Sequence, residues 1–304
     1  MRITTTIVTN CTQRKAPTES KIDLVRLPSQ LGVEELASAW LDVVSEASRE
    51  LPADQMYRGR SIADATASAA FVESSWFVIS AGLGLVRSSE KIPAYECTVA
   101  SGSELCYRLK TAGATTADWW SAITSHQPRP LSRLISHAPT LLALPSSYLQ
   151  MVHDDLAEVS TSESKHLRIF TSAAGARVVP SHLVNCVMPY DDRLEAMEGH
   201  AGTRSDFAQR ALRHFVETLE ATTLPIEEAR SRVLTALEGR TSPVRLTGRR
   251  MSDEEIQRVL TEQWNRHAGS STRLLRYLRD EAGISCEQKR FRKLWQSLAP
   301  TLRA

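Results

Sequence analysis

The chain has 304 residues and a nearly balanced charge, with 37 basic and 35 acidic side chains. Its hydrophobic content of 42% is ordinary for a globular protein, and no apolar run approaches the roughly 20 residues that cross a bilayer. The five cysteines form no Cys-x-x-Cys pair and the histidines show no His-Glu-x-x-His spacing, so no disulfide framework, metal site or cofactor is expected. The first residues lack the pattern of a signal peptide, which favours a cytoplasmic protein.

The charge is unevenly distributed along the chain. Residues 244–304 carry 13 basic and 7 acidic side chains, whereas the preceding residues carry 24 and 28. A basic tail on a mildly acidic body predicts an acidic partner, most often nucleic acid. Thr241-Ser242-Pro243 has the composition of a linker, so we expect one domain over 1–243 and a second over 244–304.

The first domain alternates between predicted strands and helices. β-Branched or continuous apolar runs predict strands over 3–9, 76–80, 140–144, 167–170 and 183–188. Apolar residues at three- and four-residue spacing predict helices over 33–50, 61–73, 146–159, 205–221 and 226–238. This alternation favours an α/β fold with a mostly parallel central sheet flanked by helices.

A glycine-containing elbow follows the predicted strand 76–80. The sequence Ser80-Ala81-Gly82-Leu83-Gly84 allows a tight turn and a close approach of the backbone to a ligand at the carboxyl end of the strand. A dinucleotide fingerprint would need a third small residue at position 87, which is Arg87. We therefore expect the elbow to line a pocket of another kind.

The first predicted strand leads into Cys11-Thr12-Gln13-Arg14-Lys15. Backbone N–H groups, the Thr12 hydroxyl and the two cations predict a loop that binds phosphate or a nucleotide. Cys11 is either a nucleophile or an inert buried thiol. Tyr57 and Arg60 begin the helix 61–73, where they either contact a base and a phosphate or form an ordinary cap.

Four motifs occur in order along residues 3–100: strand-Cys11-Thr12-x-x-Lys15, Tyr57-x-Gly59-Arg60, Ile79-Ser80-Ala81-x-x-Gly84-Leu85 and Pro93-x-Tyr95. Together they resemble the YaaA-like group, which is similar in architecture to uracil-DNA-glycosylase-like domains. Some defence members of that group resemble DNA glycosylases that remove hypermodified bases from phage DNA, the Brig type. The resemblance implies a nucleobase pocket, for which we assign as substrate-binding residues Asn10, Cys11, Thr12, Tyr57, Ser80, Gly82, Gly84 and Tyr95.

Two carboxylates, Asp191 and Asp192, follow the predicted strand 183–188 and are the candidate catalytic residues. Cleavage of an N-glycosidic bond builds positive charge on the sugar, which a carboxylate can stabilise. Arg193 could bind the 3′ or 5′ phosphate of the nucleotide. Alternatively, Asp192 pairs with Arg193 or caps a turn.

The basic tail has three predicted helices, over 252–266, 270–281 and 285–298. Ser252-x-x-Glu255 and Ser285-x-x-Gln288 are capping-box patterns, and Ala282-Gly283-Ile284-Ser285 predicts a tight turn. A helix, a glycine-containing turn and a basic helix are typical of a helix-turn-helix that binds DNA, although a small bundle with a solvated charged face fits too. The DNA-binding candidates of the whole chain are Arg14, Lys15, Arg60, Arg193, Lys289, Arg290, Arg292 and Lys293.

The sequence therefore predicts a DNA glycosylase that removes a modified base such as glucosyl-hydroxymethylcytosine and leaves abasic sites in phage DNA. Its expected partner is double-stranded or flipped-base DNA, without a membrane. The alternatives are a non-catalytic DNA-binding stress or repair protein, and a nucleoside hydrolase or deoxyribosyltransferase.

Overall fold

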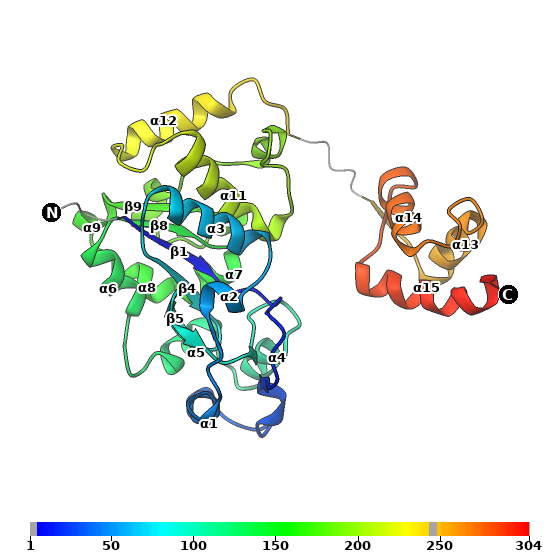
Figure 1. Ribbon diagram of the computed structural model, residues 1–304, viewed down its shortest axis with the longest axis horizontal. Helices are drawn as coiled ribbons and strands as arrows, with labels where there is room; N and C mark the ends of the chain where they lie inside the picture. Colours follow the sequence, from blue (N-terminus) through cyan, green and yellow to red (C-terminus); the bar gives the residue numbers. More distant parts are fainter. Residues whose placement is uncertain (1–4, 243–247, 304) are drawn as a thin grey trace. The chain divides into compact units, whose positions relative to one another are not determined.

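The protein is described by a computed structural model over residues 5–242 and 248–303, and the chain divides into two compact units, 1–242 and 243–304. The first unit has a five-stranded central sheet with helices around it, and the second is mostly helical (Figure 1). The predicted α/β fold, with a mostly parallel sheet and a helical C-terminal region, is confirmed.

The central sheet has the strand order β5-β4-β1-β8-β9. Its strands are β1 Thr6–Asn10, β4 Trp76–Ser80, β5 Gly84–Arg87, β8 Thr140–Ala143 and β9 Leu167–Phe170. Strand β1 runs parallel to β4 and β8, β8 runs parallel to β9, and β5 is antiparallel to β4. All residues of β1, β8 and β9 are buried, and apart from Asn10 and Arg168 they are apolar or β-branched, as expected for strands covered on both faces. Residues 3 and 4 of the strand predicted over 3–9 lie outside the described residues.

The strand order reverses direction at β1. The chain leaves β1 to form β4 on one side, and later returns to form β8 on the other side and then β9 beyond it. The connections that leave the carboxyl ends of β1 and β8 thus run in opposite directions. In open α/β sheets, this separation of the two loops produces a crevice between neighbouring strands.

Helices surround the sheet. Helix α3 packs on α11 and β1, α11 also contacts β8 and β9, and α5 contacts α1 and α7. The helices of this unit are α1 Val33–Glu46, α2 Ala53–Met56, α3 Arg60–Phe71, α4 Glu104–Thr111, α5 Thr116–Ile123, α6 Pro130–His137, α7 Ser146–Met151, α8 His153–Ala157, α9 Thr161–Ser164, α10 Ala173–Ala176, α11 Phe207–Arg213 and α12 Ile226–Leu237. Short strand pairs join β2 Ile22–Asp23 to β7 Tyr95–Glu96 and β3 Leu51–Pro52 to β6 Lys91–Ile92.

The strand predicted over 183–188 is wrong. Ser181–Cys186 forms a 3-10 helix, η2, and beyond it Val187 makes a single bridge to Ile169 of β9. Leu183 and Cys186 are both buried. A 3-10 helix places residues three apart on one face, so it buries this pair without extending the backbone. Two of the apolar residues that predicted a strand are thus buried at the three-residue spacing of a 3-10 helix.

The elbow after β4 is a hairpin turn. Gly84 adopts a φ of +74°, and β5 then runs back along β4 in antiparallel pairing. Two tryptophans bind the backbone of the turn. Trp40 donates its indole N–H to the Gly82 carbonyl at 2.6 Å, and Trp119 donates to the Ala81 carbonyl at 2.7 Å. These bonds hold the turn against helices α1 and α5.

The second unit contains α13 Asp253–Gln263, α14 Ser271–Arg276, a π-helical turn Tyr277–Glu281 and α15 Gln288–Arg303, with the short parallel pair β10 Arg249–Arg250 and β11 Ile284–Ser285. The Ser252 capping box is confirmed. The box predicted at Ser285 is wrong, because α15 begins at Gln288 and Ser285 pairs with Arg250 in β11. This unit has its own core, which includes Ile256, Leu274 and Phe291.

Candidate functional site

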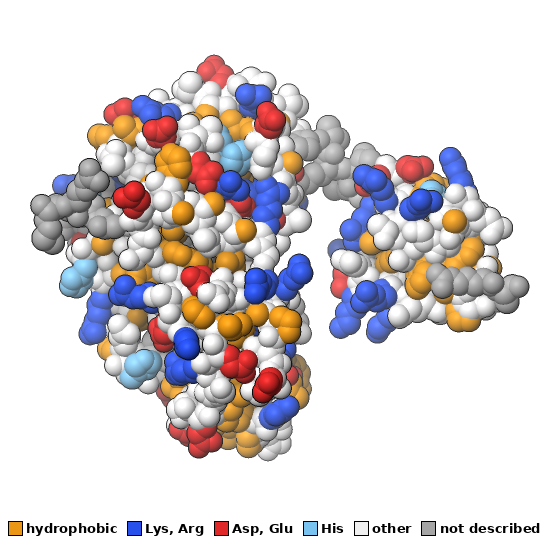
Figure 2. Space-filling model, in the orientation of Figure 1, with side chains coloured by type: hydrophobic (Ala, Val, Ile, Leu, Met, Phe, Trp, Pro, Cys, Tyr) orange, Lys and Arg blue, Asp and Glu red, His pale blue; other side chains and the backbone are white. Residues whose placement is uncertain are grey.

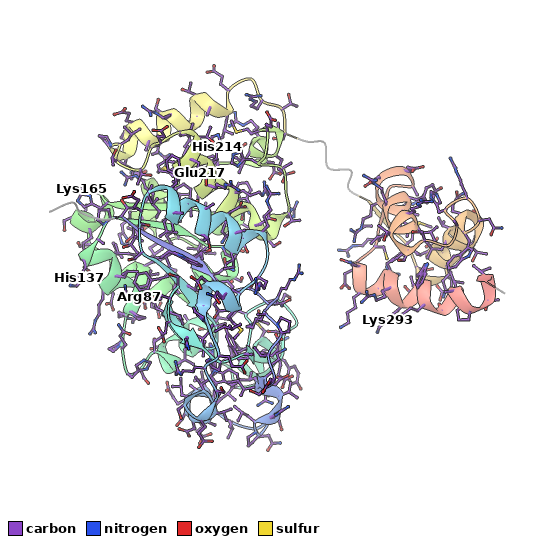
Figure 3. The ribbon with its side chains drawn as sticks, in the orientation of Figure 1. Arg87, His137, Lys165, His214, Glu217 and Lys293 are labelled. Carbon is purple, nitrogen blue, oxygen red and sulfur yellow. The ribbon has the colours of Figure 1, made fainter. Side chains whose placement is uncertain are left out.

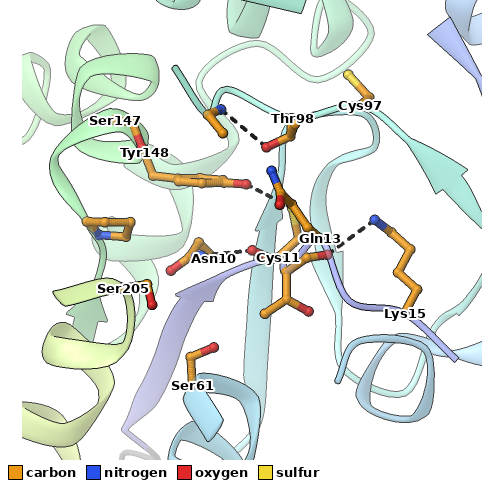
Figure 4. A pocket seen from close by; sticks show the side chains of 13 residues that line it. Asn10, Cys11, Gln13, Lys15, Ser61, Cys97, Thr98, Ser147, Tyr148 and Ser205 are labelled. Atoms are coloured by element: carbon orange, nitrogen blue, oxygen red, sulfur yellow. Dashed lines mark hydrogen bonds between the residues drawn. The ribbon is translucent and has the colours of Figure 1, made fainter. Parts of the chain in front are cut away.

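A pocket of about 410 Å³ opens at the carboxyl ends of β1 and β8, where the strand order reverses (Figure 4). Its lining comes from five separate stretches of the chain, all in the first unit. The lining residues are Asn10, Cys11, Thr12, Gln13, Lys15, Ser61, Cys97, Thr98, Ala100, Pro145, Ser147, Tyr148 and Ser205. The set has one lysine, several hydroxyl groups, two thiols and no carboxylate.

Two lining residues meet where Cys11, directly after β1, contacts Tyr148 of α7. The thiol of Cys11 lies 3.0 Å from the phenol oxygen of Tyr148, and both side chains are buried. Figure 4 shows Tyr148 reaching towards Cys11 from the α7 side. Burial is the main cause that raises the pKa of Tyr148, followed by the negative charge that Cys11 would carry. The Tyr148 phenol therefore stays protonated near neutral pH and can donate a hydrogen bond.

Gln209 of α11 holds the side chain of Asn10 by a hydrogen bond. Its side-chain N–H group lies 2.8 Å from Asn10 Oδ1, 2.9 Å from Thr9 Oγ1 and 3.0 Å from the Ala143 carbonyl. Asn10 in turn donates to the Cys11 carbonyl at 2.8 Å. Gln209 thus holds the ends of β1 and β8 together and fixes the orientation of the Asn10 side chain.

Lys15 is enclosed by aromatic rings at the other side of the pocket. Its ammonium lies 4.2 Å from the centre of the Tyr95 ring and 5.8 Å from that of Tyr57, and donates to the Thr12 carbonyl at 3.2 Å. Burial lowers the pKa of Lys15, while the nearby Cys11 and Glu96 oppose that effect. The backbone of the loop is paired here, because Lys15 forms an isolated β-bridge with Tyr57.

A chain of hydroxyl groups lies behind Lys15. The phenol of Tyr95 is 2.8 Å from that of Tyr57 and 2.6 Å from Ser80 Oγ, which also accepts the backbone N–H groups of Gly82 and Leu83. Burial raises the pKa of both tyrosines, so both phenols are neutral at physiological pH. These residues support the pocket and do not line it.

The sequence-predicted substrate residues therefore fall into two layers. Asn10, Cys11 and Thr12 line the pocket, and the others stand behind it: Tyr57, Ser80, Gly82, Gly84 and Tyr95. Gly82 explains the close packing of the second layer, since a Cβ there would lie 2.9 Å from the Tyr95 ring and 3.0 Å from Cys97 Cβ.

The predicted cations of the first unit have different surroundings. Arg14 is exposed, and Lys15 lines the pocket. Arg60 donates to the carbonyls of Gly199 and Ala201, and its Nε lies 3.4 Å from Asp64. Arg60 therefore fastens the segment that leads to Ser205, a lining residue, to the first turn of α3.

Asp191 and Asp192 do not line the pocket. Asp191 caps the 3-10 helix Asp192–Ala196 and accepts from Arg193 Nε at 2.9 Å. Hydrogen bonds from Arg193 are the largest cause that lowers the pKa of Asp191. Asp192 is exposed. The structure thus brings Asp191 and Arg193 together with each other, apart from the residues around Cys11.

In the second unit, α15 presents Lys289, Arg292 and Lys293 to solvent. Arg290 is half-buried and is ion-paired with Asp253 at 2.5 Å. Lys and Arg side chains gather on this unit in the space-filling view (Figure 2), and Lys293 projects from α15 (Figure 3). Three of the four predicted cations of α15 are therefore exposed on its surface.

Several lining residues were missed by the sequence analysis, including Ser61, Cys97, Tyr148 and Ser205, as was the supporting Gln209. Ser147 and Tyr148 directly follow the predicted strand 140–144, so the rule that ligands bind at carboxyl ends of strands could have found them. No local pattern marks Gln209, which lies about 200 residues from its partner Asn10.

Comparisons with protein-family models, with curated proteins and with solved structures gave no match to this chain. Within residues 5–242 and 248–303, no helix is long and apolar enough to cross a membrane. The same residues contain no cluster of three or more His, Cys, Asp or Glu side chains arranged to hold a metal ion.

Proposed function

We propose that the first unit binds a nucleobase in the pocket beside Cys11 and Tyr148 and cleaves its N-glycosidic bond, and that the second unit holds the DNA. The observation that carries this proposal is the pocket itself, which lies where the strand order reverses and combines a lysine and hydroxyl groups without any lining carboxylate. Such a lining offers hydrogen bonds to a polar ligand and does not repel a negatively charged one.

The polar groups of the pocket suit a base attached to a sugar phosphate. The hydroxyls of Ser61, Ser147 and Ser205 can each donate and accept, which matches the mixed donors and acceptors on a base edge. Ser61 lies in the first turn of α3, where free backbone N–H groups favour an anion. The Tyr148 ring offers an apolar surface, as base-flipping enzymes use to hold an extruded base.

The exposed cations of α15 support DNA binding by the second unit. Lys289, Arg292 and Lys293 would neutralise phosphates, a contact that depends on charge and is independent of base sequence. A hypermodified cytosine, such as glucosyl-hydroxymethylcytosine in phage DNA, is the proposed substrate on the strength of the motif resemblance.

The decisive experiment incubates the full chain with phage DNA that contains glucosylated hydroxymethylcytosine and, separately, with unmodified DNA. We expect released base and abasic sites in the modified DNA alone. Asn10→Ala should lose base release while keeping DNA binding, because Asn10 lines the pocket and α15 does not contribute to it. Absence of base release from every modified DNA tested would overturn the glycosylase proposal.

The assignment of Asp191 and Asp192 as catalytic needs its own test. Because neither carboxylate lines the pocket, we expect Asp191→Asn and Asp192→Asn to keep base release. Loss of activity in either variant, with the fold intact, would restore that assignment.

A nucleoside hydrolase is the second candidate, favoured by one observation: every lining residue belongs to the first unit. In that case residues 1–242 alone would cleave free nucleosides as fast as the full chain does. A DNA glycosylase would instead lose activity on DNA when α15 is removed, most strongly at low salt concentration, where the charges of α15 contribute most to DNA binding. If the chain binds DNA but neither releases a base from DNA nor cleaves free nucleosides, it is a non-catalytic DNA-binding protein.

A further inference from the structure

Lys15 is the pocket residue whose surroundings are hardest to explain as packing alone. Its side chain enters the pocket from a loop whose backbone is fixed on both sides, since Ala16 N–H donates to the Met56 carbonyl at 2.7 Å and Arg58 N–H donates to the Arg14 carbonyl at 2.9 Å. A lysine that only covers a surface would be free to move its ammonium into water. The side chain of Lys15 is partly buried, and its ammonium is held against the ring of Tyr95.

No carboxylate of the described residues forms an ion pair with Lys15. Glu96 attracts it at longer range but is itself ion-paired with Lys21 at 2.6 Å. The groups in contact with the ammonium are two ring faces and the Thr12 carbonyl. A partly buried cation without an ion-pair partner is costly, and the usual response is a shift towards the neutral amine.

The direction of that shift agrees with the geometry. Burial is the largest cause that lowers the pKa of Lys15, and the surrounding phenols of Tyr57 and Tyr95 remain neutral because burial raises their pKa. Lysines that act as nucleophiles depend on such desolvation, because the neutral amine is the reactive form.

We infer that Lys15 is the nucleophile of the reaction, attacking C1′ of the flipped nucleotide and forming an imine with the sugar. This inference rests on the proposed glycosylase function and adds the group that performs it. It also accounts for a pocket that lacks a lining carboxylate, because an amine nucleophile makes carboxylate stabilisation of a free sugar cation unnecessary.

The step balances with the groups at hand. The Lys15 nitrogen forms a bond to C1′, and the C1′–N bond to the base breaks, with its electron pair leaving on the base, which takes a proton from water. One amine proton passes to the ring oxygen as the sugar ring opens, leaving a protonated imine between Lys15 and C1′. Water then hydrolyses the imine, which returns the amine and leaves an abasic site. No oxidant or reductant is needed.

The other role for Lys15 is that of a permanent cation that binds a phosphate, as the sequence analysis assigned it. The two roles differ in what Lys15→Arg does. Arginine keeps the charge and can stack on Tyr95, but it does not form an imine at neutral pH. A phosphate-binding role survives this change, and a nucleophilic role does not.

The test adds cyanoborohydride, which reduces an imine to a stable amine, to the full chain with two DNAs. One is phage DNA that contains glucosylated hydroxymethylcytosine, and the other is a synthetic duplex with one abasic site. We expect a covalent protein–DNA adduct with both, mapped by mass spectrometry to the peptide that contains Lys15. Lys15→Arg and Lys15→Met should lose the adduct and lower base release by about 100-fold or more.

Lys165→Gln is the matched control. Lys165 (Figure 3) is exposed and precedes β9 at its amino end, whereas the pocket lies at the carboxyl ends of the strands, so its loss should change neither the adduct nor base release. Unchanged thermal unfolding of the Lys15 variants would exclude misfolding as the cause of their loss.

The outcomes separate this inference from the function on which it rests. Base release without an adduct, or base release that persists in Lys15→Arg, overturns the nucleophile and leaves the glycosylase standing. An adduct that maps to another residue also overturns it. If no DNA yields free base but the abasic duplex still traps Lys15, the imine chemistry holds and the glycosylase proposal fails. If neither is seen, both fail.

Discussion

At the scale of single residues, the pocket depends on side chains that no ligand would touch. Gln209 lies wholly inside and donates to three acceptors that belong to β1 and β8. Ser80 accepts two backbone N–H groups of the hairpin turn and meets the Tyr95 phenol. Buried polar groups of this kind are costly to leave without partners, so they specify one geometry of the site.

Gln209→Ala should therefore destabilise the first unit. The change leaves acceptors of Thr9, Asn10 and Ala143 without their common donor, which costs about 1–3 kcal/mol of unfolding free energy. Urea denaturation would measure the loss. Gln150→Ala is the control, since Gln150 is exposed on α7 and its replacement should cost little. Equal stability of the two variants would contradict the bridging role of Gln209.

His214 should make the stability of the first unit depend on pH. Burial, together with the charge of His200, lowers the pKa of His214 to about 4 from its usual 6.5. The unfolded chain takes up this proton near pH 6.5 and the folded one near pH 4, so the stabilisation is complete above 6.5 and is lost as the pH falls towards 4.

His214→Gln keeps a polar partner for the Tyr190 phenol, which lies 2.8 Å from the imidazole, and removes the titration. We expect the variant to lose less stability than the wild type between about pH 7.5 and about pH 5 in urea denaturation. His137→Gln, a change at an exposed histidine (Figure 3), should behave like the wild type. Identical pH profiles for all three proteins would contradict the assignment.

At the scale of elements, caps and turns fix where the helices of the second unit begin. Ser252 and Glu255 exchange side-chain hydrogen bonds with each other's backbone N–H groups at the start of α13. The corresponding pattern at Ser285 forms no cap, because Ser285 is drawn into pairing with β10. The same local motif therefore has different outcomes, depending on whether a neighbouring segment competes for the backbone.

Ser252→Ala should destabilise the second unit by about 1 kcal/mol, the usual cost of losing a serine cap. The measurement is thermal or urea unfolding of the full chain, in which the transition of the first unit serves as an internal control. A loss that is confined to the first unit, or absent altogether, would contradict the importance of this cap.

The exposed face of α15 should determine the salt dependence of DNA binding. We expect Arg292→Gln and Lys293→Gln each to weaken binding to any DNA sequence and to reduce the slope of log affinity against log salt by about 1. Arg258→Gln, at an exposed position of α13, is the matched control. Titrations at several salt concentrations that show equal effects for all three variants would argue against a specific role for α15.

At the scale of the whole molecule, the two units have separate hydrophobic cores. The first is built from residues of β1, β4, β8, β9 and their helices, and the second from Ile256, Leu260, Trp264 and their neighbours. Each core is complete within its own unit, so each unit has what it needs to fold alone.

We therefore expect two unfolding transitions in the full chain, each reproduced when residues 1–242 and 248–304 are expressed apart. Circular dichroism and calorimetry of the three proteins would measure this. A single cooperative transition that disappears when the chain is divided would show that the units stabilise each other.

The sequence by itself determined those features that depend on neighbours a few residues apart. Buried strands such as β1 and β8 can be recognised in the sequence as runs of mostly apolar or β-branched residues. The start of α13 can be recognised from the capping-box spacing of Ser252 and Glu255. The basic tail and the loop Cys11–Lys15 could also be recognised as features with a chemical preference, because charge and residue type are local properties.

Only the tertiary structure decided which side chains meet. Tyr148 lies beside Cys11, Gln209 beneath Asn10 and Ser205 at the rim of the same pocket, although long stretches of chain separate them. Tertiary packing also placed most of the predicted strand 183–188 in the 3-10 helix Ser181–Cys186 and paired Asp191 with Arg193. It put Gly82 of the glycine elbow against Tyr95 and Cys97. The physical reason is that these contacts arise from the order and direction of strands in the sheet, which periodicity along the chain does not encode.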